Sequence, residues 1–176
     1  MAEDRTFIHL LRDQVRHGLT TAQQYLAAAV YFDAQRLPEL AAQTYARSAD
    51  NRGHALRIVR YLLDREIGVA IGGLDEVRPD FDSPRAAIAF LLDRERAVTS
   101  QISALAAAAR EADDYLGEQF MQWFLKEQVA DVAEMDTLLT VLDRQGNLFD
   151  VEEFIRRELT GSTTVDTTAP RMAGAG

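Results

Sequence analysis

A few polar side chains interrupt apolar helical stripes along this chain, and their chemical types suit metal binding. Glu95 falls within a run of leucine, valine and isoleucine at helical spacing, and Gln128 and Asp131 fall three residues apart within another such run. His54 precedes Ile58 by one helical turn on a third stripe. Burying an unpaired carboxylate costs roughly several kcal/mol, so each acidic side chain needs a partner or a metal ion. Carboxylate oxygens and imidazole nitrogens are ligands that suit iron, manganese and zinc.

Each of these side chains also has an ordinary structural explanation. His54 alone could be a core or surface histidine, and Glu95 could pair with an arginine. Gln128 and Asp131 could form a hydrogen-bonded core network. Tyr25, on the apolar stripe of the first helical stretch, could pack in the core with its hydroxyl bonded to Glu95. Their combination at matching depths of four helical stretches favours one shared site.

The elements that must hold these residues are helices. In the first stretch, apolar or small residues recur at alternating spacings of four and three, which is the period of one helix face. Proline in the first turn and capping residues predict where later helices begin. Five helical stretches are predicted, at residues 6–33, 37–65, 84–110, 115–144 and, shorter, 148–159. The four long ones each extend about 40 Å at about 1.5 Å per residue.

The connections between these helices define the topology. The first and third links are short, so each joins an antiparallel hairpin. Residues 68–84 are rich in glycine and proline and form one long link, enough to run the length of a bundle. We therefore predict an all-α four-helix bundle with one long crossover and a short C-terminal fifth helix. Residues 1–159 would form this domain, and residues 160–176, made largely of small residues, are predicted to be a disordered tail.

Composition restricts the partners of the chain. Hydrophobic residues make up 47% of it and charged residues 27%, as in ordinary globular domains, and the formal net charge is -9. A negative surface disfavours nucleic acid and attracts cations, metal ions included. The absence of cysteine excludes disulfides and thiolate metal sites. Neither a signal peptide nor an apolar run long enough for a bilayer is visible, so we expect a cytoplasmic protein with no membrane partner.

Four sequence strings add a resemblance to a known family. They are TTAQQY at 20–25, AVYF at 29–32, LGEQFMQWF at 116–124 and NLF at 147–149. With these strings the chain resembles the bacterial non-haem ferritins, especially the actinobacterial type, over about residues 6–158. The resemblance implies a ferritin-like bundle whose fifth helix lines the fourfold axes of a 24-subunit iron-storage shell filled with ferric mineral. No haem is expected, because no methionine matches the haem-binding position of bacterioferritin.

The resemblance also implies a metal-binding role for the interrupting polar residues. The family's ferroxidase centre, which oxidises Fe(II) with O2, uses a glutamate of the first helix, Glu-x-x-His of the second, a glutamate of the third and Gln-x-x-Glu of the fourth. His54, Glu95 and Gln128 match these ligands, and Asp131 replaces the last glutamate with a shorter carboxylate. Tyr25 matches the tyrosine beside such centres and is the one candidate catalytic side chain.

Two ligands of the family's centre are missing here. Asn51 replaces the glutamate of Glu-x-x-His and offers only a neutral amide oxygen, and Gly18 stands where the first-helix glutamate is expected. Iron favours hard anionic oxygen ligands, so a site left with Glu95 and Asp131 as its only carboxylates should bind it weakly. Close helix packing is the alternative explanation of Gly18. We therefore expect weak or absent iron binding at this position and weak or absent ferroxidase activity.

Several functions stay open on the sequence alone. The favoured one is a homo-oligomeric iron-storage subunit, a 24-mer, that oxidises iron poorly. The chain could instead be a structural or regulatory subunit that co-assembles with an active ferritin, like the light chains of animal ferritins, or a ferroxidase with an altered site. A dimeric binding module without a cage is disfavoured by the fifth helix, whose apolar contact face would consist of Leu148, Phe149, Phe154 and Ile155.

Overall fold

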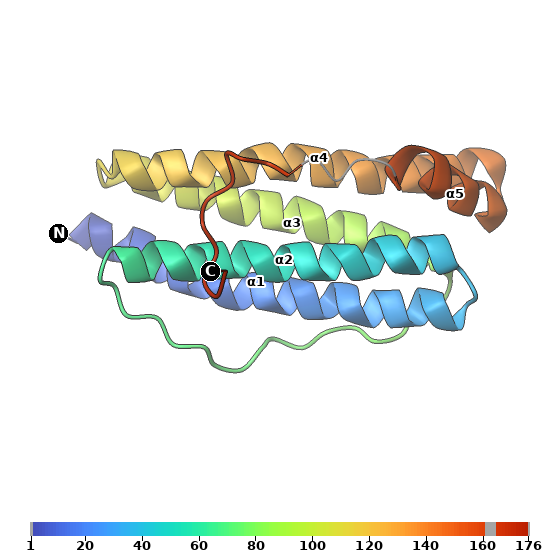
Figure 1. Cartoon of the computed structure of the whole chain (residues 1–176), viewed down its shortest axis with the longest axis horizontal. Helices are drawn as coiled ribbons and strands as arrows, with labels where there is room; N and C mark the ends of the chain where they lie inside the picture. The colour runs from blue at the N-terminus through green and yellow to red at the C-terminus, as the bar shows by residue number, and fades with distance from the viewer. Residues whose placement is uncertain (1, 161–164, 176) are drawn as a thin grey trace.

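Four long helices and one short helix make up the structure, a computed structural model that describes residues 2–160 and 165–175. The helices are α1 (Ala2–Ala34), α2 (Pro38–Asp64), α3 (Pro84–Glu111), α4 (Tyr115–Gln145) and α5 (Leu148–Phe154), followed by a π-helical turn, η1 (Ile155–Leu159). No strand occurs within the described ranges. α1 and α2 form one antiparallel pair, and α3 and α4 form the other (Figure 1). The predicted all-α four-helix bundle with a short fifth helix is confirmed.

Local capping determines where the later helices begin and end. The hydroxyl of Ser83 accepts a hydrogen bond of 3.1 Å from an amide in the first turn of α3, and the carboxylate of Asp114 accepts one of 2.9 Å at the start of α4. Gly146 ends α4 with a φ of 70°, a left-handed conformation that favours glycine. The side chain of Asn147 then caps α5. Because these signals are local, the predicted bounds of α3 and α4 agree with the structure to within one residue.

The long crossover between α2 and α3 follows α1 along the bundle. In Figure 1 it leaves the end of α2 and runs beneath the α1–α2 pair to the start of α3. Arg12 donates from Nε to the Gly68 carbonyl at 2.9 Å, near one end of the segment. Gln24 makes two 2.8 Å hydrogen bonds with the backbone of Arg78, near the other end. The crossover therefore pairs its own backbone groups with α1 although it contains no helix.

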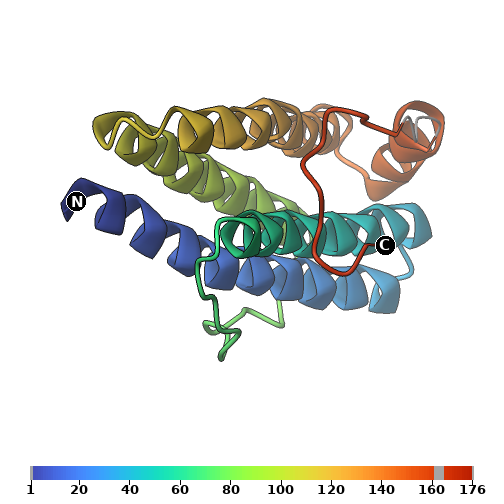
Figure 2. The ribbon, with the colours of Figure 1, turned by 60° about the vertical axis from the view of Figure 1, so that its left-hand side comes forward.

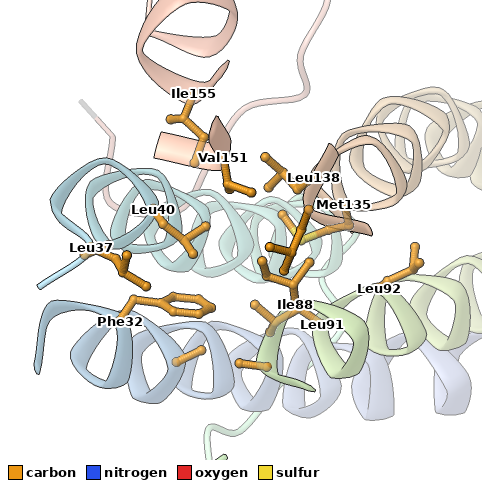
Figure 3. Close-up of a cluster of buried hydrophobic side chains, with 14 of the residues drawn as sticks. Phe32, Leu37, Leu40, Ile88, Leu91, Leu92, Met135, Leu138, Val151 and Ile155 are labelled. Atoms are coloured by element: carbon orange, nitrogen blue, oxygen red, sulfur yellow. The ribbon is translucent and has the colours of Figure 1, made fainter. Parts of the chain in front are cut away.

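Two apolar clusters fill the interior, one toward each end of the bundle. The cluster at the α5 end gathers side chains from all five helices (Figure 3), among them Phe32, Leu40, Ile88, Met135, Leu138 and Val151. The opposite cluster includes Phe7, Leu11, Ile58, Leu105 and Phe124. Along α2, α3 and α4, the buried polar residues fall between members of the two clusters, so they lie at one level of the bundle. Apart from Thr44, these residues are Asn51, Glu95, Gln128 and Asp131, and we call these four the polar layer.

The C-terminal segment lies against the outside of the bundle. Residues 165–175 cross from α4 to α2 (Figure 2). Trp123 donates from Nε1 to Asp166 at 2.9 Å, and the Ala173 amide donates to the Leu56 carbonyl at 3.1 Å. The sequence predicts disorder from residue 160 onward. Residues 161–164 lie outside the described part, and disorder of the tail stays a prediction.

The bundle helices are amphipathic rather than uniformly apolar. Each buries one face and exposes the other to solvent. In the part of the chain that the structure describes, no helix has the combination of length and apolar character needed to cross a bilayer.

Candidate metal centre

Glu95 on α3 is the centre of a buried hydrogen-bond network. Its side chain is 1% exposed, and the Tyr25 hydroxyl on α1 donates to its Oε1. Gln128 on α4 donates from Nε2 to Oε2 of Glu95 and to the Thr99 hydroxyl, each at 3.1 Å. The pKa of Glu95 is raised, mainly by burial and next by the charge of Asp131. The hydrogen bonds from Tyr25 and Gln128 offset part of this increase. Both carboxylate oxygens of Glu95 are therefore bonded by side chains of the bundle itself.

Asp131 on α4 forms an ion pair with Arg47 of α2. The guanidinium contacts Asp131 through Nη1 and Glu134 through Nη2 and Nε, the last at 3.2 Å. Gln43 donates to Glu134 as well, at 2.7 Å. Burial lowers the pKa of Arg47, but the charges of Asp131 and Glu134 outweigh this effect and raise it overall. The guanidinium is thus firmly charged between two carboxylates.

The sequence did not single out Arg47 or Glu134 as part of the site. Arg47 precedes Asn51 by four residues and Glu134 follows Asp131 by three, so each lies on the same helix face as a candidate ligand. That spacing is the signal that could have identified them. The sequence suggested an arginine as an alternative partner of Glu95. In the structure, Arg47 pairs with Asp131 instead.

His54 on α2 contacts aromatic rings rather than carboxylates. Its ring meets Trp123 and Phe124 edge-on, with centroid distances of 5.5 and 5.9 Å. Burial lowers its pKa to about 4, with Asp50 offsetting only part of the effect, so the imidazole is neutral at pH 7. The described hydrogen bonds and ion pairs include none between His54 and Glu95 or Asp131.

Asn51 and Gly18 occupy the positions of the two expected missing ligands. Asn51 donates from Nδ2 to the backbone carbonyl of Arg47 at 2.9 Å, so its amide bonds its own helix. A Cβ added to Gly18 would lie 3.1 Å from the Cβ of Ala55, closer than ordinary van der Waals contact. α1 therefore approaches α2 closely at Gly18, and this contact gives the glycine a packing role of its own.

Two hollows adjoin the polar layer, and neither collects all of its residues. One is a cavity of about 20 Å³ whose lining includes Gly18, Asn51, His54 and Gln128 but neither Glu95 nor Asp131. It has room for about one water molecule, whereas a two-metal centre needs ions about 3.5–4 Å apart with anionic ligands. The other hollow, about 420 Å³, opens between α2, α4 and the tail and includes Arg47, His54 and Asp131 in its lining.

The described residues, 2–160 and 165–175, contain no group of three or more His, Asp or Glu side chains arranged to hold a metal ion. The predicted site residues divide into separate sets instead. Tyr25, Glu95 and Gln128 share one network, and Asp131 belongs to an ion pair. As they are arranged, these residues do not fit a two-iron centre.

Comparison with known proteins identifies the family to which the chain belongs. Residues 8–145 match the ferritin family, described as a ferritin-like domain. The chain is 52% identical over 174 residues to ferritin BfrB of Mycolicibacterium smegmatis, covering 98% of this chain and 96% of the relative. The chain belongs to the ferritin family. The resemblance to bacterial non-haem ferritins predicted from the sequence strings is thereby confirmed.

Other ferritins share the similarity. Ferritin BfrB of Mycobacterium tuberculosis is 49% identical over 169 residues, covering 96% of this chain and 93% of the relative. An open pore ferritin from the archaeon Archaeoglobus fulgidus superposes with a TM-score of 0.82 at 24% identity, over 88% of this chain and 98% of that chain. The last comparison shows the fold alone. Membership in the ferritin family thus rests on the whole chain rather than on an assembled metal centre.

Proposed function

We propose that the chain is a subunit of an iron-storage cage in which the ferroxidase centre is impaired or absent. Its similarity to ferritins over nearly its whole length supports storage of iron as cargo. The proposal includes a homo-oligomeric shell of 24 subunits in the cytoplasm, with ferric mineral inside. It includes no haem, nucleic acid or membrane.

The impairment is supported by one observation, that both carboxylates of the polar layer already have partners within the protein. An Fe(II) ion entering the layer would have to displace Tyr25 and Gln128 from Glu95, or Arg47 from Asp131. Such displacement would leave buried polar groups unsatisfied, at roughly 1–3 kcal/mol each. His54, Gln128 and Asn51 remain candidate ligands by position, but two of them are neutral amides.

The fifth helix supports assembly through fewer residues than the sequence suggests. Ile155 is 2% exposed and packs within its own subunit, and Leu148 and Phe154 pack partly against the same cluster. Phe149 is 75% exposed. We therefore assign the intersubunit contact of α5 mainly to Phe149.

A light-chain-like subunit that co-assembles with an active ferritin is the second candidate. The internal ion pair of Arg47 favours it, because a subunit that balances its own buried charges needs no metal for stability. Co-expression with an active ferritin, followed by native mass spectrometry, would show mixed cages if this role applies.

Aerobic Fe(II) oxidation by the purified homo-oligomer tests the proposal. We expect slow oxidation without a rapid phase that saturates near two irons per subunit, and accumulation of ferric mineral inside the particle. A rapid phase with that stoichiometry of about two would show an active centre and overturn the impairment. Failure to retain iron at all would overturn storage.

A variant that restores the missing carboxylates provides the matched comparison. Gly18→Glu with Asn51→Glu should raise the oxidation rate above that of the unchanged chain if ligands limit activity. The Gly18 substitution needs α1 and α2 to separate by a few tenths of an ångström at Ala55. An unchanged rate in a correctly assembled variant would show that the ligands do not limit the reaction.

A further inference from the structure

We propose that Arg47 is a built-in cation that replaces bound metal as the counter-charge of the polar layer and excludes metal from it. This inference deepens the proposed function, on which it rests, by giving the impaired site a cause within the chain. This cause is a cation present in the site, and it is separate from the two ligands that are missing at Gly18 and Asn51.

The first support is the position of the guanidinium. Its side chain is only 12% exposed and lies between Asp131 and Glu134, whose side chains are 8% and 16% exposed. It contacts one oxygen of Asp131 and both oxygens of Glu134. A planar fork with several donors suits two carboxylates at once, so these oxygens are occupied in the way that a metal ion would occupy them.

The second support is the charge balance. Glu95 receives hydrogen bonds from neutral donors, Tyr25 and Gln128, and the ring of His54 packs against Trp123 and Phe124. Arg47 is therefore the positive charge that faces the α4 carboxylates at this level of the bundle. A divalent cation brought to Asp131 would meet the guanidinium at short range in a poorly screened interior, where like charges repel strongly.

The third support is that the ion pair of Arg47 and Asp131 is not closed off from small ions, so metal would have to be excluded by charge rather than by steric blocking. Arg47, His54 and Asp131 all line the 420 Å³ hollow between α2, α4 and the tail. Small ions in that hollow can reach the ion pair. A metal ion in the hollow must therefore compete with the guanidinium for the carboxylates. Removing the guanidinium should allow the metal ion to bind.

Metal binding and thermal unfolding of the assembled protein test the role of Arg47, with Co(II) as the probe and without iron or oxygen. Arg47→Gln should bind about one more Co(II) per subunit than the unchanged chain, at least about tenfold more tightly at that site. Co(II) should raise the melting temperature of this variant more than that of the unchanged chain. Adding Asp131→Asn should abolish the gain, which would place the ion in the polar layer.

Two control variants separate metal exclusion from ordinary ion-pair loss. Arg47→Lys keeps the charge and should gain no Co(II). Arg96→Gln removes an exposed interhelical pair instead, since Asp136 lies 3.5 Å away and both side chains are more than half exposed, and this variant should also gain no Co(II).

Several results would overturn the inference. They are a folded Arg47→Gln variant that gains no Co(II), an equal gain in Arg96→Gln, or a lowered melting temperature that Co(II) does not restore. Should Arg47→Gln fail to fold, Arg47→Met keeps the apolar stem for packing. If neither variant folds even with Co(II) present, metal cannot replace the guanidinium and the inference is wrong. None of these results bears on iron retention by the cage, which is measured separately.

Discussion

At the scale of single residues, the bundle satisfies its two most buried carboxylates in different ways. Glu95 is held by neutral hydrogen-bond donors on α1 and α4, and Asp131 is held by the cation Arg47. Removing one partner of a buried carboxylate costs more stability than breaking an exposed ion pair, because the buried charge stays behind without compensation. The polar layer should therefore be sensitive to substitutions that remove a single donor.

Tyr25→Phe tests this sensitivity with a minimal change. The substitution keeps the ring in the core and removes the donor to Glu95, so we expect a loss of about 2 kcal/mol in unfolding free energy. Chemical denaturation at one fixed protein concentration measures the loss. Tyr45→Phe is the matched control, because it removes an exposed 3.3 Å bond to Asp33 and should cost less than about 0.5 kcal/mol. Equal losses in the two variants would contradict the network around Glu95.

The candidate site could be predicted from the sequence only in part. The polar interruptions on apolar stripes correctly indicated that Glu95, Gln128 and Asp131 are buried, since burial follows from helical period. Which partner each one has could not be predicted, because partners come from other helices. The arginine at Asp131 depends on how α2 is rotated against α4, and no local pattern encodes that rotation.

At the scale of elements, α5 stabilises the bundle because one of its side chains caps the N-terminus of α2. The residue before α2, Leu37, has no side chain that can accept a hydrogen bond. The carboxylate of Glu152 on α5 accepts from the amides of Glu39 and Leu40 instead, at 2.9 and 2.8 Å. An acidic group at a helix N-terminus pairs free amides and complements the helix dipole. The short helix thus stabilises a long one that is distant in sequence.

Glu152→Ala should therefore destabilise the protein although α5 is short. We expect a loss of about 1 kcal/mol in unfolding free energy, since two amides of α2 lose their partner. Chemical denaturation of the assembled protein measures it. Glu153→Ala is the neighbouring control, because Glu153 pairs only with Arg156 and Arg157 of its own turn among its described ion pairs. A larger loss in the control would refute the cap.

The tail makes a prediction that depends on pH. Hydrogen bonds from the Thr168 hydroxyl and then from Trp123 lower the pKa of Asp166 to about 2. Because this pKa lies below the ordinary value of 3.8, the turn of Asp166 with Thr168 and its contact with Trp123 are favoured above pH 3.8 and are lost as the pH falls through about 2. The emission of Trp123, the one tryptophan of the chain, should differ between the unchanged protein and Asp166→Asn at pH 7, and the difference should disappear as the pH falls below about 2. Identical emission at pH 7 would instead support the disorder predicted from composition.

The helices themselves were the most predictable elements. Their period, their capping residues and the glycine-rich link are properties of short stretches of sequence, and so the order and ends of α2, α3 and α4 followed from them. The tail contacts could not be predicted in this way. They join residues such as Asp166 and Trp123 that are 43 positions apart, and nothing in the composition of the tail indicates a docking partner.

At the scale of the whole molecule, apolar surface left exposed on one subunit indicates where assembly would bury it. Phe149 is 75% exposed on a helix whose other apolar residues pack inward. A lone aromatic side chain in water gains roughly 1.5–3 kcal/mol when it is buried, and symmetric packing repeats that gain at every copy of the contact. A shell built on such contacts should be weakened by one charge at this position while each subunit stays folded.

Phe149→Asp should therefore release smaller assemblies without unfolding the chain. Light scattering coupled to size-exclusion chromatography should show a large particle for the unchanged protein and species of lower mass for the variant, with helical circular dichroism unchanged. Val165→Asp, at a residue 88% exposed in the tail, is the control and should keep the large particle. The effect arises because four like charges would meet where four aromatic rings are proposed to pack, and like charges in a closed contact repel strongly. An intact particle in Phe149→Asp would remove α5 from the proposed fourfold contact and assign assembly to other surfaces of the bundle.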